Sequence, residues 1–283
     1  MQTSKILYQK MNNNCRNLYL DLMKRILLNL IYNEPETEIE ILSSRPLIKV
    51  ILKILAIFNL RISIIKPFDL KERLEGLDWP VRAHTMVGLK RLDNLQFCVE
   101  EIIKNHIPGD LIETGAWRGG ACILMRAILK AYEINNRIVW VADSFEGLPK
   151  PNIKKYPLDR KKIPFDTVDY LKVSLSEVKE NFKSYNLLDR QVRFLKGWFK
   201  DTLPTAPITK LAFIRLDGDM YESTITSLEN LYPKLSVGGY VIIDDFGLLP
   251  ACRQAVLDYR EKNNIKEKII KIDSCGVYWK RKY

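Results

Sequence analysis

Short apolar runs alternate with helical periodicity from about residue 110 to the C-terminus. The apolar runs predict buried β-strands at 110–113, 137–142, 191–195, 211–216 and 240–243. Between them, apolar residues recur at three- and four-residue spacing and predict helices at 118–133, 168–185, 221–235 and 251–263. Strands that alternate with helices in this way favour an α/β fold with a mainly parallel sheet that helices cover on both faces.

Two more segments extend this pattern at its ends. The runs 268–272 and 277–280 lie close enough together to form a terminal hairpin, which would bring the sheet to seven strands with an antiparallel edge. Residues 86–106 predict a helix that leads into the first strand, because leucines recur at Leu89, Leu92 and Leu95.

The first 80 residues follow a different pattern. Residues 16–32 predict an amphipathic helix, and 47–65 are strongly apolar but contain Lys49, Lys53 and Arg61. A membrane span needs about 20 mostly apolar, nearly uncharged residues, so we expect none here. The apolar stretch fits a helix docked on the core or on another subunit, or a basic helix on a membrane surface. We expect an N-terminal helical extension over 1–80 and one α/β domain over 81–283.

The formal net charge of +11 could indicate an anionic partner such as nucleic acid, a membrane surface or a phosphorylated substrate. The excess is spread along the chain without an Arg-aromatic module, so we expect no nucleic-acid partner. The five cysteines are scattered and form no CxxC pair, which indicates reduced thiols. The first ten residues lack the apolar core of a signal peptide, so we expect a cytoplasmic protein.

Carboxylates follow two neighbouring strands near the end of the chain. Asp217 and Asp219 come after the strand at 211–216, and Asp244 and Asp245 come after the strand at 240–243. The carboxyl ends of such strands share one crevice, where crowded carboxylates repel one another unless a cation or proton neutralises them. Oxygen ligands suit Mg²⁺, although a solvated turn would also explain the acids. We expect Asp219 to cap the next helix.

A glycine-containing loop after the first strand points to a second ligand. The loop, from Glu113 to Gly120, has GxxxGG spacing, so the GxGxxG dinucleotide fingerprint is absent. Asp143 ends the second strand and could accept hydrogen bonds from ribose hydroxyls, which both NAD and S-adenosylmethionine (SAM) carry. Glu113 would repel a pyrophosphate but could favour a cationic methionine, so the sign of its charge favours SAM.

Three further features allow two interpretations each. Trp198 could lie beside an adenine or pack in the core. His84 could be a base, or it could position the segment Thr85-Met86. The long connection 149–165 could be a lid over the substrate or a structureless excursion.

At these residues the chain resembles the macrocin O-methyltransferase (TylF/MycF-like) family of SAM-dependent sugar O-methyltransferases. The resemblance covers roughly 70–283, whereas 36–68 shows no correspondence. The matching stretches are 78–80, 83–86, 88–93, 109–120, 140–149, 195–204, 215–224, 231–245, 251–255 and 276–279.

The resemblance implies a class I SAM-dependent (Rossmann-like) methyltransferase domain, Mg²⁺ dependence and a homo-oligomer. It assigns the metal to Asp217, Asp244 and Asp245, and the role of base to Asp217. It assigns SAM to Thr85, Met86, Glu113, Thr114, Gly115, Ala116, Trp117, Asp143, Ser144, Phe145, Glu146, Gly147, Gly197 and Trp198.

Methylation of a sugar hydroxyl on a glycosylated natural product is the activity that this family implies, so we expect a small glycoside as the substrate. Two other functions remain open from the residues alone. One is an NAD-dependent nucleotide-sugar oxidoreductase, against which the missing GxGxxG spacing counts. The other is a non-catalytic membrane-surface protein on a methyltransferase fold, which the basic apolar stretch 45–65 would suit.

Overall fold

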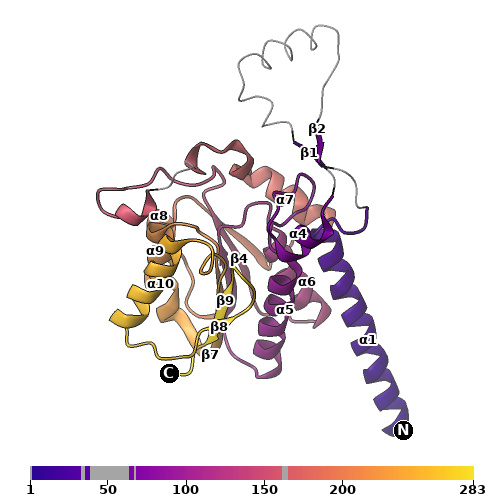
Figure 1. Cartoon of the computed structure of the whole chain (residues 1–283). Helices are drawn as coiled ribbons and strands as arrows, with labels where there is room; N and C mark the ends of the chain where they lie inside the picture. Colours follow the sequence, from indigo (N-terminus) through magenta and orange to yellow (C-terminus); the bar gives the residue numbers. More distant parts are fainter. Residues whose placement is uncertain (1, 33–35, 39–63, 67, 161–164) are drawn as a thin grey trace.

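A computed structural model describes residues 2–32, 36–38, 64–66, 68–160 and 165–283 (Figure 1). Its centre is a seven-stranded sheet in the order β5-β4-β3-β6-β7-β9-β8, which confirms the predicted sheet. The strands from β5 to β7 are parallel, β9 runs antiparallel to β7, and β8 runs antiparallel to β9. The strands are β3 (Asp110–Thr114), β4 (Val139–Asp143), β5 (Val192–Lys196), β6 (Leu211–Leu216), β7 (Leu235–Ile243), β8 (Ile270–Lys271) and β9 (Val277–Lys280).

Helices cover both faces of the sheet, because successive residues of each central strand point to opposite sides. In β3, Leu111 joins the core on one face and Ile112 joins the core on the other. The first face carries α1 (Gln2–Leu27), α5 (Leu89–Lys104), α6 (Gly120–Ala131) and α7 (Leu175–Ser184). The second face carries α8 (Phe199–Thr202), α9 (Tyr221–Leu231) and α10 (Pro250–Lys262) (Figure 1).

The N-terminal helix α1 begins earlier and ends earlier than the sequence predicts. Leu20, Met23 and Leu27 are buried in the same core as α6, and the Arg16 guanidinium donates to the Ala131 carbonyl at 3.0 Å. The start of α1 projects beyond the body of the molecule (Figure 1). None of the helices in the described part of the chain is long and apolar enough to cross a bilayer.

Short elements connect α1 to α5. Strands β1 (Glu36–Glu38) and β2 (Ile64–Lys66) pair antiparallel, and α4 (Leu70–Glu75) follows them. Most of the basic apolar stretch at 45–65 lies outside the described residues, so both interpretations of it stay open.

Several predicted helices are shorter than expected, and for two of them a local reason is evident. The helix predicted at 168–185 begins at Leu175, because Ser174 caps its first turn through Glu177 N at 3.2 Å. The helix predicted at 221–235 ends at Leu231, because Pro233 has no N–H to continue the ladder. Strand β7 then starts at Leu235, five residues before the predicted start, and a bulge follows its first pair with β6.

The loops after β3 and β6 touch at the carboxyl edge of the sheet. Asp217 N donates to the Thr114 carbonyl at 2.9 Å. Gly115 has a φ of +87°, and a Cβ added there would lie 1.7 Å from the Asp217 carbonyl oxygen. Only glycine fits at this crossing, since any side chain would push the two loops apart.

We expect Gly115→Ala to lower the free energy of unfolding by roughly 2–5 kcal/mol, because it adds backbone strain and a clash with fixed backbone. Gly218→Ala is the matched control, since its Cβ would come no closer than 3.0 Å to the Ser223 side chain and 3.4 Å to the Phe199 ring. That substitution should cost about 1 kcal/mol or less. Urea unfolding followed by circular dichroism measures both, and equal losses would contradict the argument.

Candidate active site

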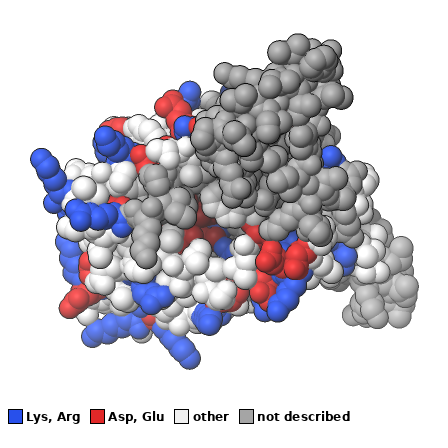
Figure 2. All heavy atoms as spheres, turned by 45° about the horizontal axis from the view of Figure 1, so that its top comes forward, with Lys and Arg blue, Asp and Glu red and all other residues white. Residues whose placement is uncertain are grey.

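The carboxyl ends of β3, β4, β6 and β7 open into a cleft with two adjoining cavities. The glycine-loop cavity, about 180 Å³, is lined by Gly115, Asp143, Ser144, Gly147, Gly197 and Trp198, among others. The acidic cavity, about 290 Å³, is lined by Trp79, Thr85, Arg91, Asp244, Asp245 and Leu248, among others. The two cavities share Met86, Trp117, Leu171, Asp217 and Asp219 in their walls. Figure 2 shows acidic side chains gathered in a hollow on this side of the molecule.

The three acids assigned to a metal lie together in the acidic cavity. One carboxylate oxygen each of Asp217, Asp244 and Asp245 lies within 4.8 Å of the others. Neighbouring parallel strands place them there, since Asp217 follows β6 and Asp244 follows β7, with Asp244 N bonded to Leu216 O at 2.9 Å. The donors are all oxygens, which is the set that Mg²⁺ prefers.

Asp219 does not cap α9 as expected. It has a φ of +58°, and its backbone N–H donates to Asp245 Oδ2 at 3.2 Å. Met220 occupies the N-cap position of α9 and has no side-chain hydrogen bond there. Asp219 therefore helps to position the acidic cluster, because its strained turn brings a backbone donor to Asp245.

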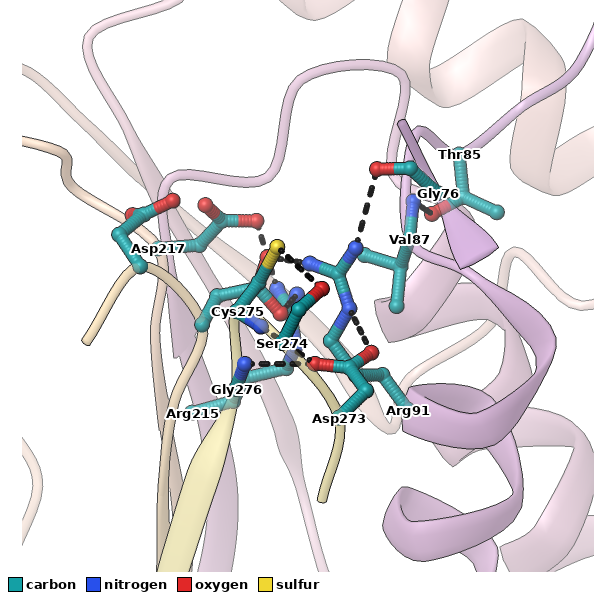
Figure 3. Close-up of polar contacts among 12 residues, drawn as sticks. Gly76, Thr85, Val87, Arg91, Arg215, Asp217, Asp273, Ser274, Cys275 and Gly276 are labelled. Carbon is teal, nitrogen blue, oxygen red and sulfur yellow. Dashed lines mark hydrogen bonds and ion pairs between the residues drawn. The ribbon is translucent and has the colours of Figure 1, made fainter. Parts of the chain in front are cut away.

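Two buried arginines balance part of the acidic charge. The Arg215 guanidinium, 1% exposed, contacts Glu113, Asp244 and, at 2.9 Å, Asp217. Arg91 contacts Asp244 from the other side, reaches Asp273 Oδ2 at 3.0 Å and donates to the Gly76 carbonyl at 3.2 Å (Figure 3). Together they hold Asp244 from two elements, β6 and α5.

The two arginines do not neutralise every carboxylate in the cluster. Burial, together with Asp219, Asp217 and Asp244, raises the pKa of Asp245 well above its ordinary value. Burial and the charge of Asp244 raise the pKa of Asp217 to about 8. Burial would also raise the pKa of Asp244, but the Arg215 and Arg91 guanidiniums hold it below its ordinary value. The cluster therefore retains room for a further positive charge, either protons or a metal cation.

Asp143 organises the glycine loop. Its carboxylate accepts hydrogen bonds from the backbone N–H groups of Ala116 at 2.7 Å, Trp117 at 3.2 Å and Phe145 at 2.7 Å. The sequence interpretation had Asp143 accept from both ribose hydroxyls, but a carboxylate has only about four acceptor positions and these three backbone donors already occupy three of them. A ribose at this end of the glycine-loop cavity would share Asp143 with the loop.

Glu113 is an internal partner of Arg215. It is 1% exposed, contacts the Arg215 guanidinium and accepts a hydrogen bond from Cys122 Sγ at 2.8 Å. Burial raises the pKa of Glu113, while Arg215 and Cys122 act to lower it. Its charge is directed at Arg215, and Glu113 also lines the acidic cavity, so its attraction of a cationic methionine stays a prediction.

Most of the other residues assigned to SAM line the cleft. Thr85, Met86, Gly115, Ala116, Trp117, Ser144, Gly147, Gly197 and Trp198 all belong to one or both cavity walls. Trp198 thus faces the glycine-loop cavity. Three assigned residues lie elsewhere, since Thr114 and Phe145 are buried in the interior and Glu146 is exposed.

His84 lines neither of the two cavities. Its Nδ1 lies 2.6 Å from the Tyr185 hydroxyl, and its carbonyl accepts from Gly120 N at 3.0 Å. Burial, with the nearby Arg118 charge, lowers the pKa of His84. These contacts favour the positioning role over that of a base.

The sequence interpretation missed Arg91 and assigned no role to Arg215. A signal existed for Arg215, because residues two apart on a strand share one face and Arg215 precedes Asp217 by two. Arg91 carries a weaker signal, since it lies beside Leu92 on a helix whose partner elements only the fold reveals.

We expect Arg215→Met to lower the free energy of unfolding by about 3–5 kcal/mol at pH 8, because it leaves buried carboxylates without their cation. The control is Lys183→Met, which removes an exposed ion pair in which Lys183 Nζ lies 2.6 Å from Glu180 Oε1. Its loss should lower the free energy of unfolding by at most about 1 kcal/mol. Urea unfolding without divalent metal compares the two. A loss below 1 kcal/mol for Arg215→Met would show that Arg91 alone balances the cluster.

Comparison with known proteins places the chain in a family. The model of the Macrocin-O-methyltransferase (TylF) family matches residues 16–281. Demethyldecarbamoylnovobiocin O-methyltransferase from Streptomyces niveus is 50% identical over 272 residues, 96% of each chain. Mycinamicin III 3''-O-methyltransferase from Micromonospora griseorubida is 46% identical over 266 residues, 93% of this chain and 96% of that one.

Solved structures agree with this assignment. The O-methyltransferase NovP superposes with a TM-score of 0.83 at 49% identity, covering 95% of this chain and 100% of that one. The calicheamicin methyltransferase CalS11, at 20% identity and a TM-score of 0.54, shares the fold. The sheet is that of a class I SAM-dependent methyltransferase, and the chain belongs to the TylF family of macrocin O-methyltransferases.

Proposed function

We propose that this protein transfers the methyl group of SAM to a sugar hydroxyl of a glycosylated natural product, with a divalent cation, Mg²⁺, held by Asp217, Asp244 and Asp245. The observation that carries the proposal is the shared wall of the two cavities, where Asp217 faces both. A methyl donor in one cavity and an alcohol in the other would meet beside that carboxylate.

The glycine-loop cavity suits SAM. Gly115 lets the backbone approach a ligand closely. In the cavity wall Ser144 supplies a hydroxyl and Trp198, next to Gly197, supplies an aromatic ring. Asp143 holds the loop through Ala116 N and Trp117 N, so the pocket is formed before a ligand arrives. Preformed pockets of this kind are typical of small-molecule sites.

The acidic triad fits a hard divalent cation. Two oxygens bound to one Mg²⁺ at about 2.0–2.1 Å lie up to about 4.2 Å apart, so a set already within 4.8 Å needs only small side-chain rotations. Asp217 has that freedom, because its side chain is 28% exposed. A cation bound there would act as a Lewis acid and lower the pKa of a sugar hydroxyl.

Asp217 is the group best placed to accept the hydroxyl proton. It lines both cavities, and a cation beside it would make the hydroxyl acidic enough to give its proton to a carboxylate. As the alcohol oxygen forms its bond to the methyl carbon, the carbon–sulfur bond breaks, the proton passes to the Asp217 carboxylate, and S-adenosylhomocysteine leaves. Holding the two reactants in line supplies much of the rate.

An apolar rim beside the acids suits the remainder of a glycoside. Leu77, Trp79 and Leu248 line the acidic cavity and remain 49%, 49% and 59% exposed. A polar sugar could reach the acids while an apolar aglycone contacts this rim, since exposed apolar surface at a pocket mouth marks a binding site. Two relatives are named for demethyldecarbamoylnovobiocin and for a rhamnosyl tetracenomycin, and the second of these carries a sugar.

We expect Asp217→Asn to lower kcat by about 10²- to 10⁴-fold, the usual contribution of a general base. Affinity for S-adenosylhomocysteine should stay within about threefold, because Asn preserves the shape of the cavity wall. Mass spectrometry of methylated demethyldecarbamoylnovobiocin or a panel of rhamnosides measures turnover, and calorimetry measures binding. Asp201→Asn, an exposed acid on α8, is the control, and full activity of Asp217→Asn would refute the role of base.

We also expect the stabilisation by Mg²⁺ to grow with pH. Because the pKa of Asp217 is raised to about 8 in the folded, metal-free protein, that state binds more protons than the unfolded state between about pH 4 and 8 and loses stability as pH rises. The ion needs the ionised carboxylate and must displace its proton, so its effect should increase up to about pH 8 and then level off.

Thermal unfolding of EDTA-treated protein, with and without Mg²⁺, measures this effect between pH 6 and 9. Sodium chloride of equal ionic strength is the control for non-specific salt effects. A Tm increase that is the same at every pH, or an unchanged pH dependence in Asp217→Asn, would contradict the assignment of the ion to Asp217.

A further inference from the structure

The helix that follows the candidate base is capped by a residue from elsewhere in the chain. Helix α9 begins at Tyr221, four residues after Asp217, and its own N-cap residue offers no side-chain acceptor. Asp159 supplies the missing acceptors, with Oδ1 taking a hydrogen bond from Tyr221 N at 2.6 Å and Oδ2 one from Glu222 N at 3.1 Å. Asp159 is 1% exposed, so these bonds are shielded from water.

Asp159 belongs to the segment 148–160, which also forms part of the glycine-loop cavity. Leu148, Pro149, Lys150 and Asn152 line that cavity. Further along, the Tyr156 ring lies 5.4 Å from the Tyr221 ring. The segment therefore contacts the cofactor side of the cleft at one end and the first turn of α9 at the other.

The turn between Asp217 and Tyr221 needs such external support. Its residue Asp219 has a φ of +58°, a conformation that persists only when the surroundings impose it. At the strand end, Asp217 N is bonded to Thr114 O at 2.9 Å. At the helix end, Asp159 binds the first two N–H groups of α9, where a carboxylate also interacts favourably with the helix dipole.

We propose that Asp159 is a positioning residue for methyl transfer: by capping α9 it fixes the turn that carries Asp217 and couples that turn to the wall of the SAM cavity. This inference rests on the proposed function for the roles of Asp217 and SAM. It predicts that a ligand in the glycine-loop cavity stabilises the segment 148–160. Through the bonds of Asp159 to α9, the same ligand would also stabilise the turn that carries Asp217.

The test compares Asp159→Ala and Asp159→Asn with Ser174→Ala. Ser174 caps α7 through Glu177 N at 3.2 Å, so its loss controls for the stability cost of losing a cap. The first readout is the rate of trypsin cleavage after Lys154 and Lys155, with and without S-adenosylhomocysteine. The second is the separate kcat and KM for SAM with a rhamnoside acceptor.

We expect Asp159→Ala to be cleaved at least tenfold faster than wild type and to lose most of the protection that S-adenosylhomocysteine gives. Its kcat should fall about 10- to 100-fold, the effect of a small misplacement of reacting groups. Asp159→Asn retains a neutral acceptor, so its cleavage rate and its kcat should lie between those of wild type and Asp159→Ala. Ser174→Ala should lower Tm comparably but keep wild-type cleavage and a kcat within twofold.

A kcat of Asp159→Ala equal to that of wild type would overturn the proposal. So would a decrease in kcat that is fully explained by the fraction of unfolded protein. So would S-adenosylhomocysteine protection of the variant as complete as that of wild type. The proteolysis needs neither acceptor nor metal, so it decides the coupling even if no glycoside is methylated, which would instead count against the proposed function. If Asp159→Ala does not fold, the same comparisons are made with Asp159→Asn.

Discussion

The crowding of carboxylates at the carboxyl edge of the sheet is the constraint on which this site depends. Asp217, Asp244 and Asp245 lie within 4.8 Å of one another, and such a group is unfavourable unless positive charge balances it. Arg215 on β6 supplies part of that charge, and Arg91 on α5 supplies another part. Because both guanidiniums are buried and hydrogen-bonded, they hold Asp244 ionised and leave Asp217 and Asp245 as the groups that respond to an added cation.

The parallel sheet places two adjoining cavities beside these acids. Strand β3 lies between β4 and β6, so the glycine loop after β3 meets Asp143 on one side and the turn at Asp217 on the other. Gly115 permits the close approach to Asp217. In the proposed function a methyl donor and an alcohol would occupy the adjoining cavities. Membership of the TylF family favours a methyltransferase over the oxidoreductase and non-catalytic alternatives.

Side chains that act across the fold were the main gap in the sequence interpretation. Asp159 caps a helix 62 residues further along the chain, and Asp143 binds backbone amides 26 and 27 residues before it. Periodicity and spacing describe neighbours within one element, so they do not reveal such partners. For the same reason the sequence did not reveal the contact of Glu113 with Arg215 on the neighbouring strand.

The sequence by itself determined the strand and helix order, the seven-stranded sheet, and the strands that end in acids, because burial on both faces demands continuous apolar runs and parallel strands end at one edge. It also carried the family resemblance. Only the tertiary structure decided which charges meet: Arg91 on α5 and Arg215 on β6 reach Asp244 through space. Ionic contacts depend on distance between side chains, and the folded chain sets that distance.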